Sequence, residues 1–333
     1  MSSLRVVLIE GDGIGPELAA AARAVIDATG VAVEWEERVA GTEALAAHGH
    51  VAPRDTIEAV ASARSALKGP TATPSGGGHR SANYYLRHGL DLFGGVRRFV
   101  DPARDVDLIL VRENLEDLYA AEEWEPEPGV AHALRVVTER GSQRIAKLAF
   151  EIAERRHRPR LTIVHKANNL KLGDGLFLRT ARAVAREHPS VSADDMLADT
   201  AGAAVVTSPA ELDVLLTGYT FGDILSSVAA AACGGPALVS TLNVGPDAVA
   251  VAEAGHGTAP DIAGKGRANP LGFVGGAAML LEARGFEREA AAVHEACAAV
   301  RVDGAVTPDL GGDATTREVA ETLAADVRVR LQS

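Results

Sequence analysis

The chain has 333 residues, of which 47% are hydrophobic and 23% are charged, and its net charge is −12 at pH 7. This length exceeds one ordinary domain, and the composition is typical of a globular enzyme and not of a disordered chain. The acidic balance excludes nucleic acid as a nonspecific partner, because such binding requires a basic face.

Cysteine usage and apolar stretches exclude further classes of protein. The two cysteines, Cys233 and Cys297, have no metal-ligand spacing, so neither a disulfide framework nor a zinc site is predicted. The first five residues lead straight into a strand-like segment and lack the regions of a secretory signal. The most apolar stretch, Val228–Val239, is interrupted by Gly234-Gly235-Pro236 and is too short to span a bilayer. We expect a soluble cytoplasmic protein with no membrane partner.

Short β-rich runs alternate with amphipathic helical stretches along the chain. Leu4–Glu10 is predicted to be a buried strand, Pro16–Thr29 a helix with proline at its first position, and Val31–Glu37 a half-exposed strand. Further strands are predicted at Val106–Val111, Leu134–Thr138, Leu161–His165 and Asp213–Thr217. Further helices are predicted at Ser142–Arg156, Gly175–Glu187, Asn269–Arg284, Glu287–Val300 and Thr315–Leu331. The alternation predicts an α/β fold with much parallel sheet covered by helices.

A glycine-rich segment, Gly11-Asp12-Gly13-Ile14-Gly15-Pro16, lies between the first predicted strand and helix. The dinucleotide-binding fingerprint is G-x-G-x-x-G with an acidic residue about 20 positions further on. Here the third glycine comes one residue early, and a proline follows it directly. The spacing favours a tight strand-to-helix turn over a Rossmann nucleotide site.

The segment 70–99 of this acidic chain is locally basic. It contains one acidic residue, Asp91, and four arginines, Arg80, Arg87, Arg97 and Arg98. A planar guanidinium binds a carboxylate through two hydrogen bonds, so converging arginines favour a di- or tricarboxylate ligand. A solvated helix face is the alternative, and composition does not decide between the two.

Motifs along the whole chain resemble those of the isocitrate/isopropylmalate dehydrogenase family. The segment from Lys68 to Arg97, which begins KGPTATPSGGGHRSAN and continues through LR and LDL, resembles the substrate loop of that family. Five further segments are similar to its other signatures and follow in family order: Val111–Ala120, Val164–Asn168, Gly222–Ser226, His256–Pro260 and Asp309–Gly312. The match extends from Gly11 to Gly312.

The resemblance implies an α/β fold with a large discontinuous domain, a smaller central domain and an active site in the cleft. We expect residues 1–98 and 246–333 to form the large, cofactor-binding domain and residues 99–245 the small dimerisation domain. Family members pair as dimers in which each site borrows residues from the partner, so a homodimer with shared active sites is expected. Their phosphate-binding loop is not a Rossmann fingerprint, which agrees with the interpretation of the first glycine segment.

The resemblance also implies which residues bind the substrate, a small anionic 2-hydroxy acid. Arg87, Arg97 and Arg112 match the arginines that hold the carboxylates common to all family substrates, which fixes the reacting carbons before hydride transfer. Ser81 and Asn83 stand where isocitrate-type members bind the distal carboxylate. Isopropylmalate-type members have bulky or apolar groups nearby, so this pair favours a polar distal group.

Two residues match the acid–base pair of the family, Tyr119 and Lys166. Oxidation of the hydroxyl needs a base to take its proton, and decarboxylation leaves an enolate that an acid must protonate. The implied reaction is the oxidative decarboxylation of a 2-hydroxy acid to a 2-oxo acid.

The resemblance also implies a divalent ion, Mg²⁺ or Mn²⁺. These ions prefer hard oxygen ligands, and such an ion would stabilise the developing carbonyl and enolate. Asp199 and Asp223 match two of the three usual aspartates, and Asp199 is expected to act across the dimer. Ser227 occupies the third position. Tyr219 and Thr220 replace the usual Asn-Leu, a second departure beside the expected chemistry.

The residues expected at the cofactor are Thr73, Asn168, Glu253, His256, Gly257, Thr258, Ala259, Asp261, Ile262 and Asn269. An acidic residue accepts hydrogen bonds from a ribose 2′-OH and repels a 2′-phosphate. Members that prefer NADP usually carry Lys-Tyr where this chain has Asp261-Ile262, so NAD is predicted. Thr73 and Glu253 are expected near the nicotinamide.

Three interpretations of the function remain open. The leading one is an NAD-dependent dehydrogenase of the isocitrate type. The second keeps the reaction and changes the distal group of the substrate to that of homoisocitrate, isopropylmalate, a tartrate-like acid or a phosphonate analogue. The third is a non-catalytic regulatory subunit. Such subunits lose catalytic residues, and Ser227 in place of an aspartate would be one such loss, but Tyr119, Lys166, Asp199 and Asp223 are all retained.

Overall fold

The structure is a computed structural model that describes residues 3–303 and 305–332. The chain folds as two compact units. The first combines both ends of the chain, up to Leu92 and from Gly234 onward, and the second is Phe93–Cys233. None of the helices in the described ranges is both long and apolar enough to cross a membrane.

In the first unit, five strands lie in the order β2-β1-β3-β12-β11. The strands are β1 (Leu4–Ile9), β2 (Val33–Arg38), β3 (Ser65–Lys68), β11 (Ser240–Val244) and β12 (Ala250–Ala254). They pair in parallel except β11, which is antiparallel to β12. The helices are α1 (Gly15–Ala28), α2 (Thr42–His48), α3 (Arg54–Ala63), α4 (Ala82–Gly89), α9 (Leu271–Glu282), α10 (Glu287–Asp303) and α11 (Thr316–Gln332). Helix α9 is apolar and buried nearly all round, as a helix at the centre of a core must be, and it packs on β11 and β12.

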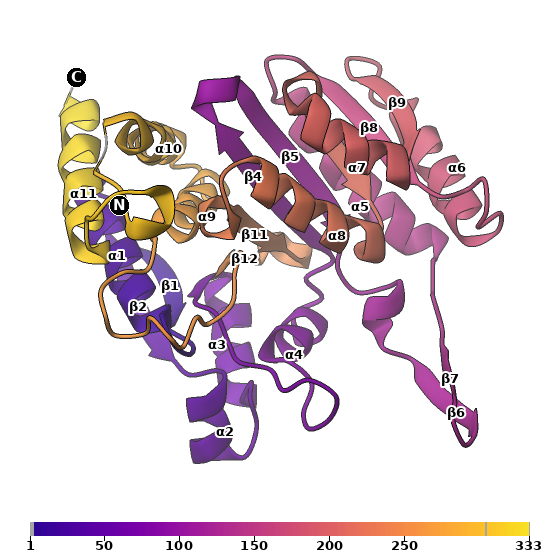
Figure 1. Ribbon diagram of the computed structural model, residues 1–333, viewed down its shortest axis with the longest axis horizontal. Helices are drawn as coiled ribbons and strands as arrows, with labels where there is room; N and C mark the ends of the chain where they lie inside the picture. The colour runs from indigo at the N-terminus through magenta and orange to yellow at the C-terminus, as the bar shows by residue number, and fades with distance from the viewer. Residues whose placement is uncertain (1–2, 304, 333) are drawn as a thin grey trace. The chain divides into compact units, whose positions relative to one another are not determined.

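In the second unit, the strand order is β4-β5-β10-β8-β9. The strands are β4 (Gly94–Asp101), β5 (Val106–Glu113), β8 (Arg160–His165), β9 (Ser192–Leu197) and β10 (Val214–Thr217). The pairing is parallel except between β4 and β5. Two helix pairs cover this sheet, α5 (Glu139–Glu154) with α6 (Gly173–Ala185) and α7 (Ala198–Thr207) with α8 (Tyr219–Ala232) (Figure 1). A hairpin of β6 (Glu123–Glu127) and β7 (Val130–Ala133) projects from the unit.

The predicted α/β fold with parallel sheet is confirmed, but the strand predicted at Leu134–Thr138 is wrong. Strand β7 ends at Ala133, and Val136 makes only an isolated bridge to Asp117. The alternating pattern gave a wrong prediction because the polar residues of this segment have other partners. Arg135 forms ion pairs and Thr138 caps helix α5, so the segment does not pair with a neighbouring strand.

The first glycine segment is a tight turn, as predicted. Strand β1 ends at Ile9 and α1 begins at Gly15, with Gly11 and Gly13 at φ of 76° and 62°. A side chain at Gly13 would place its Cβ 2.1 Å from the carbonyl oxygen of Thr258, so glycine is required there. The Ile14 N–H donates to that same oxygen at 3.0 Å. The turn therefore supports the segment in which the nucleotide-binding residues are predicted.

The parallel strands of the second unit bring functional candidates to one edge. Arg112 lies near the carboxyl end of β5, Lys166 directly follows β8, and Asp223 lies in the first turns of the helix after β10. The carboxyl ends of parallel strands form one edge of a sheet, where open α/β folds bind their ligands.

Candidate active site

Arg112 is the centre of a charged cluster at this edge. Its side chain is fully buried, and Nε and Nη2 donate to Oδ1 of Asn114 at 3.2 and 3.1 Å. Nη1 donates to Oδ1 of Asp223, and Nη2 of Arg97 lies 3.8 Å from the same atom. A Cβ at Gly222 would lie 2.6 Å from Cγ of Arg112, so that glycine makes room for the arginine. The cluster unites two predicted carboxylate-binding arginines and a predicted metal ligand.

Tyr219 connects Arg112 with Tyr119. The guanidinium of Arg112 lies 4.6 Å from the centroid of the Tyr219 ring, within the range of a cation–π interaction. The rings of Tyr219 and Tyr119 are 4.5 Å apart at an interplanar angle of 31°. The sequence identified Tyr219 only as a departure from the family pattern. Its contacts place this departure directly against the expected acid–base tyrosine.

Lys166 forms a second cluster with Asp199. Its Nζ donates to Oδ1 of Asp199 at 2.5 Å, and this hydrogen bond lowers the pKa of the Asp199 carboxyl. Asp199 is two-thirds exposed and Asp223 about half exposed, so both carboxylates are accessible. Asn168, predicted at the cofactor, is exposed just after Lys166.

Ser227 lies one turn after Asp223 on α8. Its Oγ donates to the backbone carbonyl of Asp223 at 3.3 Å, a bond within the helix. Across residues 3–303 and 305–332, no three acidic, histidine or cysteine side chains gather closely enough to hold a metal ion.

In the first unit, Arg87 on α4 forms a buried ion pair with Glu253 on β12, with Nη2 to Oε1 at 2.6 Å. Leu86 and Leu90 pack into the core and fix the orientation of α4. Lys68, which sequence analysis left without a role, lies buried beside this pair. Burial lowers its pKa to about 8, with Arg87 acting in the same direction and Glu253 opposing. Arg87 and Glu253, predicted at the substrate and the cofactor, are thus in direct contact.

Ser81 and Asn83 lie at the start of α4. Oγ of Ser81 accepts the Tyr84 N–H at 3.0 Å and is the N-cap of the helix. Oδ1 of Asn83 is buried and finds no hydrogen-bond partner among the described residues. Buried polar atoms usually have a hydrogen-bond partner, either in the protein or in a bound molecule.

The predicted nucleotide-binding segment follows β12. Nδ1 of His256 is 3.0 Å from the carbonyl of Gly257, and burial lowers the pKa of this imidazole. Nδ2 of Asn269 donates to Oδ2 of Asp309 at 3.0 Å, which anchors the end of the segment. Ala259 has a φ of 37°, and Asp261 is exposed. Thr73, predicted near the nicotinamide, is exposed in the loop after β3.

Glu113 is a buried carboxyl that sequence analysis missed. It follows Arg112, and its Oε2 accepts the N–H groups of Leu115 and Glu116 at 2.9 and 2.7 Å. Burial raises its pKa to about 7, although these two hydrogen bonds act in the opposite direction. Alternating polarity cannot reveal such a residue, because its burial arises from tertiary packing.

Glu113 should make the stability of the protein depend on pH. Between pH 4.5 and about 7, the Glu113 carboxyl keeps its proton in the folded chain but has lost it in the unfolded chain. The free energy of unfolding should therefore fall as the pH rises through this window. The shift corresponds to an effect on the order of 3 kcal/mol. Glu113→Gln should remove this part of the pH dependence, measured by denaturant unfolding at several pH values. Exposed Glu151→Gln is the control, and an equal pH dependence in both variants would contradict the prediction.

Known proteins resemble this chain over nearly its whole length. A sequence model of the isocitrate/isopropylmalate dehydrogenase family matches residues 5–323. The mitochondrial isocitrate dehydrogenase [NAD] subunit alpha of Homo sapiens is 39% identical over 332 residues, which cover 97% of this chain and 90% of that protein. The isocitrate/homoisocitrate dehydrogenase of Thermus thermophilus is 43% identical over 326 residues, covering 96% and 97%. The crystal structure of isocitrate dehydrogenase from Methylococcus capsulatus has a TM-score of 0.89 at 42% identity, covering 97% and 99%.

Proposed function

The chain belongs to the isocitrate/isopropylmalate dehydrogenase family, and we propose that it oxidises and decarboxylates an isocitrate-like 2-hydroxy polycarboxylate with NAD and a divalent metal ion. The predicted class, an NAD-dependent oxidoreductase, is confirmed by relatives that match nearly the whole chain. The observation that carries the proposal is the cluster of Arg97, Arg112 and Asp223 beside Tyr219 and Tyr119.

The residues of this cluster supply the elements of the reaction. Arg97 and Arg112 bind carboxylates of the substrate and so orient the carbon that is oxidised. One member of the Tyr119–Lys166 pair takes the hydroxyl proton, and the other protonates the enolate that remains when CO₂ leaves. When bound, NAD accepts the hydride and Mg²⁺ or Mn²⁺ polarises the developing carbonyl.

The carboxylates of Asp223 and Asp199 fit a divalent ion. Both are accessible oxygen donors of the kind that Mg²⁺ prefers.

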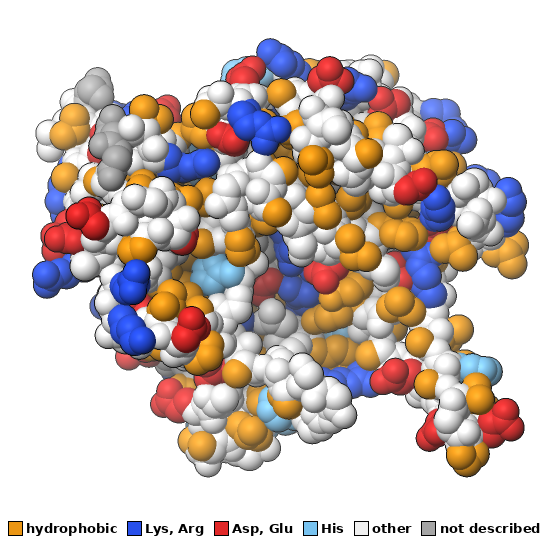
Figure 2. Space-filling view, viewed as in Figure 1, with side chains coloured by type: hydrophobic (Ala, Val, Ile, Leu, Met, Phe, Trp, Pro, Cys, Tyr) orange, Lys and Arg blue, Asp and Glu red, His pale blue; other side chains and the backbone are white. Residues whose placement is uncertain are grey.

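We further propose a homodimer in which each active site takes residues from both subunits. Lys166 and Asp199 of one chain are bonded to each other. If Asp199 completes the partner's site, Lys166 accompanies it, and the Tyr119 and Lys166 that act together come from different subunits. Val206 on α7 and Ile224 on α8 are large, exposed apolar residues, and hydrophobic side chains gather over these helices (Figure 2), as at a subunit interface.

The cofactor should be NAD, with at least about tenfold lower catalytic efficiency for NADP. A tenfold preference needs only about 1.4 kcal/mol, and a phosphate placed beside Asp261 should lose more than that. Asp261→Lys combined with Ile262→Tyr should shift the preference toward NADP, measured as kcat/KM for both cofactors. Exposed Glu282→Lys controls for the change in charge. Equal use of the two cofactors by the unmodified protein would refute the assignment.

An assay against a panel of 2-hydroxy acids, with Mn²⁺ and NAD, tests the function. We expect a substrate with a polar distal group, isocitrate or homoisocitrate, to give the highest kcat/KM, because the buried Oδ1 atom of Asn83 has no partner in the protein and could accept a hydrogen bond from such a group or from a water bound to it. A tartrate-like acid and a phosphonate analogue complete the panel. Higher kcat/KM on isopropylmalate than on every polar-tailed acid would overturn the substrate class, and no activity on any member would overturn the reaction.

A further inference from the structure

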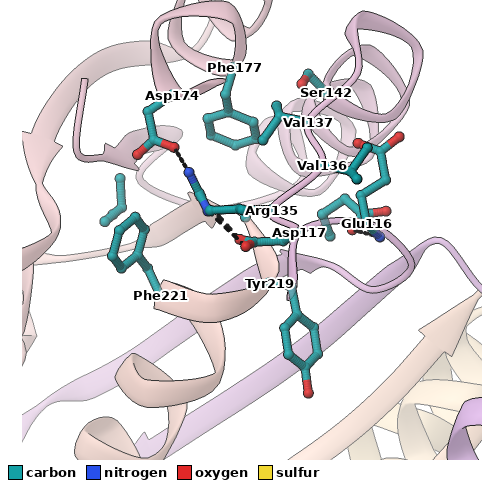
Figure 3. A pocket seen from close by; sticks show the side chains of 13 residues that line it. Glu116, Asp117, Arg135, Val136, Val137, Ser142, Asp174, Phe177, Tyr219 and Phe221 are labelled. Carbon is teal, nitrogen blue, oxygen red and sulfur yellow. Dashed lines mark hydrogen bonds and ion pairs between the residues drawn. The ribbon is translucent and has the colours of Figure 1, made fainter. Parts of the chain in front are cut away.

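One arginine, Arg135, holds two buried aspartates together in the second unit. Its Nε and Nη2 donate to Oδ1 and Oδ2 of Asp117 at 2.7 and 3.0 Å, and its Nη1 donates to Oδ1 of Asp174 (Figure 3). Both aspartates are 2% exposed. No role was assigned to Arg135 from the sequence, where it lay within a predicted strand.

Asp117 fixes the segment that carries Tyr119. Its Oδ1 accepts the Leu118 N–H at 2.8 Å and caps the short 3-10 helix Leu118–Ala120. The φ of Asp117 is 61°, a strained value for a residue with a side chain, which persists only where the surroundings impose it. The two-pronged bond from Arg135 is one of those constraints.

Asp117 also fixes the start of α8. The N–H and Oγ1 of Thr220 donate to its Oδ2 and Oδ1 at 3.1 and 2.8 Å. Asp223 lies one turn further along this helix, and Tyr219, whose ring contacts Tyr119 and Arg112, precedes Thr220. The carboxylate of Asp117 therefore relates the Tyr119 segment to the helix that carries the proposed metal ligand.

Asp174 fixes the backbone of Lys166. Its Oδ2 accepts the Lys166 N–H at 2.5 Å, while its Oδ1 accepts from Arg135. The network lies against Phe177, Val137 and Phe221 (Figure 3), and the ring of Phe221 is 5.3 Å from the guanidinium. Apolar surroundings strengthen these bonds and make the loss of one partner costly.

A buried ion pair contributes little net stability compared with apolar packing, so stability alone does not account for this arrangement. We propose that Arg135 is a positioning residue, which keeps Tyr119, the backbone of Lys166 and the Asp223 helix in fixed relation. The inference rests on the proposed function, because it assumes that these three residues act in the reaction. It extends that function by naming the residue on which their mutual geometry depends.

Arg156 provides a matched control for Arg135. It too joins two aspartates, with Nε to Asp213 at 2.7 Å and Nη1 to Asp107 at 2.9 Å, and its side chain is 19% exposed against 21% for Arg135. Asp107 and Asp213 lie near the amino ends of β5 and β10, at the opposite ends of these strands from Arg112 and Asp223. Loss of either arginine removes ion pairs to two aspartates, but only those of Arg135 touch the proposed catalytic segments. The aspartate side chains that Arg156 joins are more exposed, at 37% and 11% against 3%, and Asp107 keeps its ion pair with Arg98.

The experiment compares Arg135→Met, Arg135→Lys and Arg156→Met in the full-length protein. Arg135→Met should lower kcat by about 100-fold with little change in the substrate KM, since small misplacement of reacting groups has effects of this size. Arg135→Lys should recover part of the loss, and Arg156→Met should keep kcat within about twofold of the unmodified protein. A kcat for Arg135→Met equal to that of Arg156→Met would overturn the proposal. If Arg135→Met does not fold, an unaltered kcat in Arg135→Lys decides against it.

Hydrogen–deuterium exchange without substrate separates this proposal from the proposed function. In Arg135→Met or Arg135→Lys, amide exchange should rise together in residues 117–121, 166–170 and 219–223, and in Arg156→Met it should not. A rise confined to one of these segments would refute the positioning role. If amide exchange rises in all three segments but the unmodified protein is inactive on every acid of the panel, the positioning role of Arg135 is supported and the proposed reaction is refuted.

Discussion

Replacing Lys166 with methionine should abolish turnover while NAD affinity remains nearly unchanged. Methionine keeps the unbranched, apolar stem but removes the ammonium group, and with it the bond to Asp199. General acid–base groups typically contribute about 10²–10⁴-fold in rate, and we expect a loss in this range or beyond it. NAD affinity should persist because the predicted nucleotide segment belongs to the other unit of the fold. Steady-state kinetics and NAD titration measure the two effects.

Exposed Lys171→Met is the matched control, since it lies five residues further on and should keep full activity. Tyr119→Phe should also slow the proton-transfer steps. Retention of more than half of the activity in either Lys166→Met or Tyr119→Phe would remove that residue from the mechanism.

Mixing these two impaired variants tests the shared site. If Tyr119 and Lys166 of one active site come from different subunits, a mixed dimer has one complete site, and random exchange should restore about a quarter of the unmodified activity. If both residues come from one subunit, every site in the mixture lacks a group, and no activity should return.

Local sequence patterns predicted those parts of the fold that depend on local interactions. Leu4–Glu10 and Leu161–His165 are rich in apolar and β-branched residues, and the strands β1 and β8 that they form are mostly buried and pair in parallel. The proline after Gly15 marks the first turn of a helix, where its missing N–H has no consequence. The motifs, compared with a known family, also identified Arg97, Arg112 and Asp223, which do meet in the structure.

Contacts between distant parts of the chain could not be predicted in this way. Arg135 lies in an alternating stretch that is typical of a strand, but its partner Asp174 is 39 residues away. The contact between the rings of Tyr219 and Tyr119 spans 100 positions and involves a residue that departs from the family pattern. A single sequence carries the propensities of its segments, whereas such partners follow only from the sheet order that brings the segments together.

Activity should depend completely on a divalent metal ion, and the protein should bind that ion much more tightly when substrate is present. In place of the three aspartates that are usual in the family, the proposed site has two protein carboxylates, those of Asp223 and, by our proposal, of Asp199 from a second subunit. Mg²⁺ commonly binds through one or two carboxylates and keeps several waters, so the site should function without a third. Because one anionic ligand is missing, the oxygens of the substrate should contribute a larger share of the binding free energy. Activity should vanish with chelator and return with Mn²⁺ or Mg²⁺.

Ser227→Asp tests whether the serine is the reason for this dependence. Its hydroxyl now donates to the Asp223 carbonyl within α8, and a carboxylate at this position, one turn from Asp223, should add an anionic ligand on the same helix face. We expect Mn²⁺ to bind at least about tenfold more tightly to the substrate-free variant, measured by calorimetry, which corresponds to about 1.4 kcal/mol. Ser226→Asp would bury a charge and is unsuitable as a control, so Ser227→Asn, which has similar size but no charge, serves instead and should leave affinity nearly unchanged. Full activity of the unmodified protein in excess EDTA would show that no metal takes part, and the decarboxylation mechanism proposed above would be wrong.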